Sequence, residues 1–315
     1  MSERDIKRLL ALVEKQLGVG WMDVSDWLRG IDANSLDAIE ARLVAGDIQG
    51  VVREVEQAAR MFAADTHAAF TRSGQAGAKW LDTQPQLADK LVRFDVTNHR
   101  AIAAARRNEI EWVQGITQDT RQMAHSAILD GQRRSANPRE VARDIREGLG
   151  LTPAQSQHVA NYRRALEQGD FANAMGRELH DARSNRMLRR LARSDGSLTP
   201  AQIDKMTESY RRSYIAYRAE TIARTESARN VHAGLDESFR QAVERGEVEA
   251  DSLVREWIAG PRTRHAREQH QDMDGSTVPF GQPFVAPDGT RLMYPGDGPP
   301  EHSANCRCTV STTVA

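Results

Sequence analysis

Apolar positions recur every three or four residues through most of the chain, up to about residue 245. This period is typical of an α-helix that buries one face and exposes the other. The clearest run begins at Leu87, Leu91 and Phe94 and continues to Gly131, and no proline interrupts residues 86–137. The pattern predicts one or two long helices there, packed against other helices through their apolar stripes.

Three helix starts share one arrangement of side chains. Each has a capping Asn or Thr, then a proline, then Glu or Gln two residues after that proline. Proline at the first helical position leaves no N–H unsatisfied, and the later side chain reaches back to the backbone N–H of the cap. The three caps are Asn137, Thr152 and Thr199, and a further helical run from about residue 206 to Gly246 predicts one long helix.

The pattern changes after about residue 250. Residues 254–259 and 306–314 are predicted strands, residues 283–285 and 291–294 are short extended runs, and residues 262–273 are a predicted short helix. Several Pro and Gly residues separate these elements, which indicates many loops. We therefore expect a small α+β module at the end of the chain.

The predicted fold class is mainly α, an elongated helical body with a small C-terminal α+β module. Aromatic residues make up only 5% of the chain and charged residues 28%, which suits narrow apolar stripes on helices better than a β-sandwich. We expect three regions. They are an N-terminal helical region over residues 1–135, helical hairpins and the long helix over residues 136–248, and the tail module over residues 249–315.

Composition also excludes some classes of function. No stretch is long and apolar enough to span a bilayer, and residues 1–5 are unlike the start of a signal peptide. We therefore expect neither membrane insertion nor secretion. The 43 basic and 44 acidic side chains leave a net charge of −1, so the chain as a whole has no attraction to nucleic acid.

Arginine is concentrated in one segment, residues 182–194, which contains no acidic residue. At helical spacing, Arg183, Arg186, Arg190 and Arg193 fall on one face, and Arg189 lies beside them. Such a face suits DNA phosphates or an acidic protein surface. The alternative is a solvated face paired with carboxylates of neighbouring helices. The segment has no interleaved aromatic residue on which bases could stack, which favours this alternative over nucleic acid.

The loop-rich tail has little area to bury, so it needs either docking or a crosslink. Its two cysteines, Cys306 and Cys308, are too close in sequence for a useful disulfide. With His302 and His270 they would form a closed, structural four-coordinate zinc site. His265 is the second choice for the fourth ligand. The alternative is that both cysteines are small buried hydrophobic residues in the last strand.

A series of short features occurs in a characteristic order between residues 222 and 310. They are residues 222–227, Asn230, Trp257, residues 262–264, His270, residues 274–275, Phe284, residues 294–297 and residues 305–308. In this order and spacing they resemble the phage Mu F-like minor head protein family, the phage head morphogenesis group. The resemblance covers about the last third of the chain.

The resemblance implies a minor capsid protein, present in few copies in the virion, that acts in head assembly near the portal and inside the capsid. It implies portal protein and other phage head proteins as partners, DNA as a further candidate partner, synthesis in the host cytoplasm, and neither a membrane nor a small-molecule substrate. In this role Arg224, Glu226, Asn230 and Trp257 would fix the tail module against the preceding helix.

Two other classes of function remain as alternatives. An open metal site with Glu268, Asp272 or Asp274 as general base would make a metal-dependent hydrolase, and Arg224 and Glu226 would suit a transferase that handles a dinucleotide. The sequence has no phosphate-binding glycine loop, Gly-x-Ser-x-Gly or His-Glu-x-x-His pattern, so we expect no enzyme. A DNA-binding accessory protein that uses the arginine face is the third hypothesis.

Overall fold

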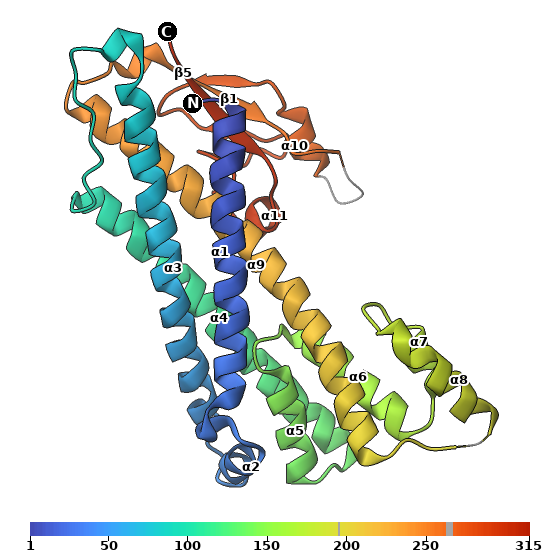
Figure 1. Ribbon diagram of the computed structural model, residues 1–315. Helices are drawn as coiled ribbons and strands as arrows, with labels where there is room; N and C mark the ends of the chain where they lie inside the picture. Colours follow the sequence, from blue (N-terminus) through green and yellow to red (C-terminus); the bar gives the residue numbers. More distant parts are fainter. Residues whose placement is uncertain (195, 263–266) are drawn as a thin grey trace. The chain divides into compact units, whose positions relative to one another are not determined.

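The computed structural model describes residues 1–194, 196–262 and 267–315 (Figure 1). Helices dominate it, and strands occur in these residues only from Leu253 onward. The predicted mainly α chain with a small C-terminal α+β module is therefore confirmed. Within the described residues, no helix combines the length and the apolar character that crossing a bilayer requires.

The chain folds into two compact units. The first consists of Met1–Trp21, Phe62–Glu111 and Glu220–Ala315, and the second of Met22–Met61 and Trp112–Ala219. Four long helices contribute a segment to each unit. They are α1 (Glu3–Gly30), α3 (Gln49–Asp82), α4 (His99–Arg134) and α9 (Pro200–Glu244).

Short helices complete the second unit. They are η1 (Asp32–Asn34), α2 (Leu36–Val44), α5 (Pro138–Gly148), α6 (Pro153–Glu167), α7 (Phe171–Met175), η3 (Ala182–Ser184) and α8 (Asn185–Arg193). Its core includes Tyr162, Tyr210, Ile215 and Leu188. Tyr162 stacks on Tyr210 of α9, with ring centroids 4.2 Å apart, so the apolar stripes of α6 and α9 meet in this core.

The predicted helix starts are confirmed. Asn137 accepts a hydrogen bond from the backbone N–H of Glu140 at 3.0 Å, and Thr152 forms a complete capping box with Gln155. Thr199 and Gln202 exchange the same pair of bonds at the start of α9, at 3.3 and 2.8 Å. Local side-chain chemistry is sufficient to place these three boundaries.

The first unit contains the tail module. Its elements are η4 (Ala250–Ser252), β1 (Leu253–Ile258), α10 (Glu268–Asp272), β2 (Thr277–Pro279), β3 (Phe284–Val285), β4 (Arg291–Leu292), α11 (Pro300–Ser303) and β5 (Thr309–Val314). β1 is the centre of an antiparallel sheet of order β2-β1-β5, and β3 pairs with β4. Trp257, Phe284, Leu292 and Val310 form the module's core together with both cysteines.

Two helix predictions differ from the structure. Leu87 ends the short helix η2 (Pro85–Leu87), and residues 88–98 are not helical, so α4 starts only at His99. The Asp95 side chain accepts from the backbone of Thr97, and Asn98 accepts from Arg100. These local bonds compete with the helix and cap its true start. In the tail, only Glu268–Asp272 of the predicted helix over residues 262–273 is helical, and residues 263–266 lie outside the described residues.

Candidate metal centre

The structure brings His270, Cys306 and Cys308 together in the interior of the tail module. His270 lies on α10, and both cysteines lie in the segment that leads into β5. One ligand atom from each residue lies within 4.8 Å of the others. The Nδ1 atom of His270 is 3.5 Å from the Sγ atom of Cys306 and 3.5 Å from that of Cys308. All three side chains are buried.

These distances fit a tetrahedral zinc ion. With Zn–S about 2.3 Å and Zn–N about 2.0 Å, a tetrahedral angle separates the nitrogen and sulfur atoms by about 3.5 Å. The donor set is one imidazole and two thiolates, which borderline and soft divalent ions prefer to carboxylates. The three residues therefore supply three of the four ligands of a tetrahedral zinc ion, and a zinc ion there would join α10 to the segment before β5.

His302 occupies a different place from that expected of a ligand. Its Nδ1 atom is 3.1 Å from Nε2 of His270, the ring nitrogen that does not face the sulfurs. Its own Nε2 atom is 2.9 Å from Oδ2 of Asp288. Three of the four expected ligands therefore share one site, and His302 stands behind His270. His265, the second choice for the fourth ligand, lies outside the described residues.

The two thiols affect each other's acidity. A hydrogen bond from Cys308 lowers the pKa of Cys306. The same bond raises the pKa of Cys308, because that thiol is the donor, and burial raises it further. The pair thus favours one thiolate before any ion binds, which is the form that coordinates a metal.

Glycine and tryptophan shape the walls of the site. The backbone N–H of Gly260 donates to Sγ of Cys308 at 3.4 Å. A Cβ atom at Gly260 would lie 2.9 Å from the carbonyl oxygen of Arg307, so only glycine lets the two segments approach this closely. Trp257 meets His270 edge to face, with ring centroids 5.3 Å apart. Both contacts hold the ligand groups in place.

The carboxylates suggested as general bases are not part of this cluster. Glu268, Asp272 and Asp274 are exposed, and Asp274 accepts a hydrogen bond from the backbone N–H of Ala259. The cluster of His270, Cys306 and Cys308 contains none of them. A hydrolase arrangement, with a base directed at a metal-bound water, is thus not supported by the positions of these groups.

Residues 157–311 match the family model described as Phage Mu protein F like protein. This part of the chain is similar to the phage Mu F-like family. The matched region is just under half of the chain and includes α9, His270 and both cysteines. The family suggests a phage head morphogenesis protein, a component of the virion that is typically structural. No curated protein and no solved structure matches the chain.

In the Mu F-like region, Arg224 contacts the segment that carries the cysteines. Its guanidinium donates to the side chain of Asn305, and the backbone N–H of Asn305 donates to Oγ1 of Thr225 at 2.8 Å. Arg224 also pairs with Glu14 of α1 at 3.2 Å. Asn305 has φ 56°, a conformation that asparagine tolerates better than most residues. These bonds attach the start of the Cys306 segment to α9.

Glu226, Asn230 and Trp257 make other contacts. Asn230 accepts from Asn108 of α4 at 3.0 Å and donates to the backbone of Glu226. Glu226 is buried beside Arg229, 3.4 Å away, and burial raises the pKa of its carboxyl group. Glu226 and Asn230 therefore point to α4 and along α9, whereas Trp257 lies in the module's own core.

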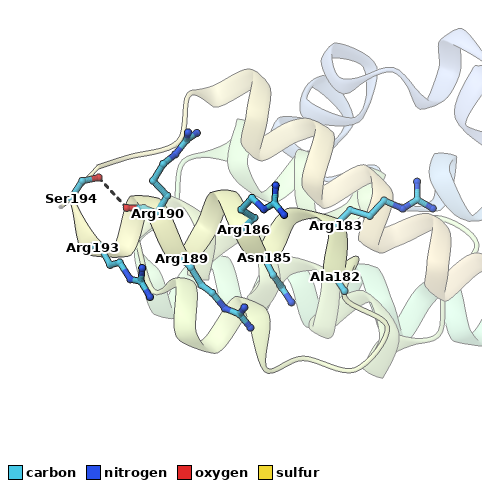
Figure 2. A pocket seen from close by; sticks show the side chains of 8 residues that line it. All are labelled: Ala182, Arg183, Asn185, Arg186, Arg189, Arg190, Arg193 and Ser194. Carbon is cyan, nitrogen blue, oxygen red and sulfur yellow. Dashed lines mark hydrogen bonds between the residues drawn. The ribbon is translucent and has the colours of Figure 1, made fainter.

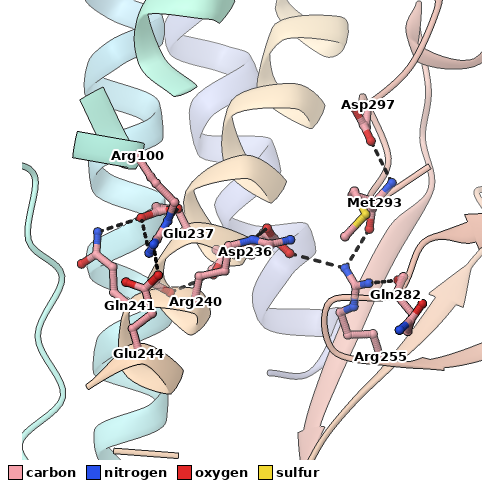
Figure 3. A network of polar contacts seen from close by, with 12 residues as sticks. Arg100, Asp236, Glu237, Arg240, Gln241, Glu244, Arg255, Gln282, Met293 and Asp297 are labelled. Atoms are coloured by element: carbon pink, nitrogen blue, oxygen red, sulfur yellow. Dashed lines mark hydrogen bonds and ion pairs between the residues drawn. The ribbon is translucent and has the colours of Figure 1, made fainter. Parts of the chain in front are cut away.

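Arg255, which the sequence pattern did not single out, links the module to α9. Its side chain is only 3% exposed and donates to the carbonyl oxygens of Met293 and Gln282 (Figure 3). It also pairs with Asp236 of α9 at 3.4 Å. Residues of β1 alternate between buried and more exposed positions, and Arg255 lies at a buried position between Leu253 and Trp257. This alternation along the strand would have indicated that Arg255 is buried.

The arginine face lies on η3 and α8 in the second unit. Arg183, Arg186, Arg189, Arg190 and Arg193 line a hollow of about 900 Å³ and are exposed (Figure 2). Arg183 pairs weakly with Asp181, at 3.7 Å. Within the part of the chain that the structure describes, the other four arginines have no ion pair with a carboxylate. The interpretation of a face neutralised by neighbouring helices is therefore not supported.

Proposed function

We propose that this chain is a minor head protein of a tailed phage that acts in head assembly, near the portal and on the inside of the capsid. The Mu F-like match over residues 157–311 is the observation that carries this proposal. The positions of the polar groups support a structural rather than a catalytic role, since the buried ones hold segments together and the three suggested general bases are exposed. Portal protein and other head proteins are the proposed partners.

In this proposal the tail module is a zinc-stapled structural unit. His270, Cys306 and Cys308 hold one zinc ion, which joins α10 to the segment before β5. A module of about 65 residues with strands of only two to six residues gains most from such a link, because its apolar core is small. The staple would present a rigid surface to a neighbouring head protein.

The function is tested by removing the gene from the phage that encodes this chain. We expect few or no complete heads in electron micrographs of infected cells, since a head morphogenesis protein is required before DNA is packaged. Complementation with the wild-type chain should restore full heads, and the restored virions should contain the protein. Normal numbers of DNA-filled heads without the chain would contradict the proposal.

A second candidate function is contact with double-stranded DNA, and the exposed arginines of this face favour it. Among the residues that the structure describes, no carboxylate pairs with four of the five cationic groups on this face, so their charge is available to phosphates. Arginine binds phosphate oxygens bidentately, and lysine is absent from the face. No aromatic side chain lines the hollow, which disfavours single strands, where bases stack on rings. Backbone contact without sequence preference is the recognition that such a face supports.

A salt titration tests the DNA contact. We expect the affinity of the wild-type chain for a duplex of about 30 base pairs to fall steeply with salt. A variant in which four arginines are changed to Gln should have a slope of log K against log salt that is shallower by about 3 to 4. The four are Arg186, Arg189, Arg190 and Arg193. The matched control changes Arg8, Arg106, Arg121 and Arg133, four exposed arginines on other helices, to Gln. An equal loss of slope in both variants would show that the DNA binding depends only on net charge. No loss of slope in the first variant would show that this face does not contact DNA.

A further inference from the structure

Asp288, His302 and His270 form a chain of hydrogen bonds that ends at the two cysteines. Asp288 Oδ2 lies 2.9 Å from Nε2 of His302, and Nδ1 of His302 lies 3.1 Å from Nε2 of His270. The planes of the two rings differ by 20° and their centroids are 5.3 Å apart. The two rings are therefore nearly parallel, and they meet through their nitrogen atoms at hydrogen-bond distance.

The acceptor at the start of the chain decides where each proton lies. A carboxylate only accepts hydrogen bonds, so the Nε2 atom of His302 carries a hydrogen. In neutral His302 the Nδ1 atom is then an acceptor, and Nε2 of His270 must be the donor to it. That leaves Nδ1 of neutral His270 without a hydrogen, and this is the atom 3.5 Å from both sulfurs.

We propose that Asp288 and His302 are positioning residues, which hold His270 in the tautomer that presents the lone pair of Nδ1 to a zinc ion shared with Cys306 and Cys308. The inference rests on the zinc staple proposed above and deepens it. Ligating histidines in general donate their second ring N–H to such a partner, which fixes the ring and raises its basicity. The inference replaces the expected ligand role of His302.

A change at Asp288 would reverse the direction of the hydrogen bonds along this chain. Its Oδ1 atom accepts from the backbone N–H of Thr290 at 2.9 Å, which holds the carboxyl group in the turn. In Asp288→Asn the amide oxygen keeps that bond and the NH₂ group faces His302. His302 must then accept at Nε2 and donate from Nδ1, so His270 accepts at Nε2 and carries its hydrogen on Nδ1, the atom that zinc needs.

Zinc affinity of the full chain, measured by competition with a chromophoric chelator, tests the inference. We expect Asp288→Asn to bind zinc about 10- to 100-fold more weakly than wild type. The matched control is Asp272→Asn, which removes the same charge from an exposed position on the helix of His270. Its affinity should equal that of wild type.

Substitution of His302 separates positioning from ligation. In His302→Gln the side-chain oxygen is able to accept from Nε2 of His270, so we expect tighter zinc binding than in His302→Leu. With Co²⁺ in place of zinc, the d–d bands of His302→Gln should match those of wild type, because the coordinating atoms are unchanged. Changed bands would identify His302 as a ligand and overturn the inference.

Two outcomes of these experiments are distinct. If wild type binds no zinc, the staple itself fails and the positioning roles fail with it. If wild type binds zinc and Asp288→Asn binds it equally well, only the positioning roles are wrong. Circular dichroism of each variant shows that the module is folded when its affinity is compared.

Discussion

The double variant Cys306→Ser/Cys308→Ser is expected to lose zinc and to unfold the tail module while the long helices remain folded. Wild type should contain about one zinc ion per chain by elemental analysis, and the variant none. Thiolates supply two of the three ligands in the cluster, and structural zinc sites contribute about 10 kcal/mol or more of apparent binding free energy in small metal-dependent domains. Limited proteolysis should then cut the variant within residues 249–315.

A chelator provides the control for this variant, because serine also changes the polarity of a buried site. Chelation should lower the melting temperature of wild type and make its tail sensitive to protease, and it should leave the variant unchanged. Wild type without zinc, or a variant tail as resistant to protease as that of wild type, would show that the cysteines are only small core residues.

Arg255→Met is the second variant with a large expected effect. The methionine fills a similar volume but leaves the carbonyl oxygens of Met293 and Gln282 without their donor (Figure 3). It also removes one cation from Asp236, which keeps its ion pair with Arg240 at 2.6 Å. Removing one partner from a buried charge typically costs about 3–5 kcal/mol. We expect a loss of that order in urea unfolding.

Arg291→Met is the matched control, since Arg291 is an exposed arginine on a strand of the same module. It should change stability by less than about 0.5 kcal/mol. If Arg255 and Asp236 interact, the loss in Arg255→Met/Asp236→Leu should be smaller than the sum of the losses in the two single variants. A loss below about 1 kcal/mol for Arg255→Met would show that the network in Figure 3 does not hold the module.

Local chemistry explains which helix predictions were correct. The caps at Asn137, Thr152 and Thr199 act within four residues, so sequence suffices to place them. The same local logic accounts for the error after Leu87. Asp95 and Asn98 stop the helix there through bonds to their own neighbours. The prediction followed the apolar period through these residues and gave their local bonds too little weight.

The metal cluster shows how far metal ligands can be predicted from residue type alone. Zinc ligand types narrowed the candidates to the two cysteines and a few histidines of the tail. Which nitrogen atoms meet the sulfurs depends on how α10, α11 and the segment before β5 pack, and these elements are separated by up to about forty residues. His302 was itself expected to be a ligand, yet its two ring nitrogens face His270 and Asp288.

The amino-acid sequence alone determined the helical class, the capped helix starts, the small terminal module and the Mu F-like resemblance. These depend on periodicity, on caps and on the order of short motifs, all of which act or are recognised along the chain. Tertiary structure alone decided the partners of Arg255, the exposure of the arginines of α8, and the order Asp288–His302–His270. Each of these depends on contacts between residues far apart in sequence, whose distance and direction no local pattern encodes.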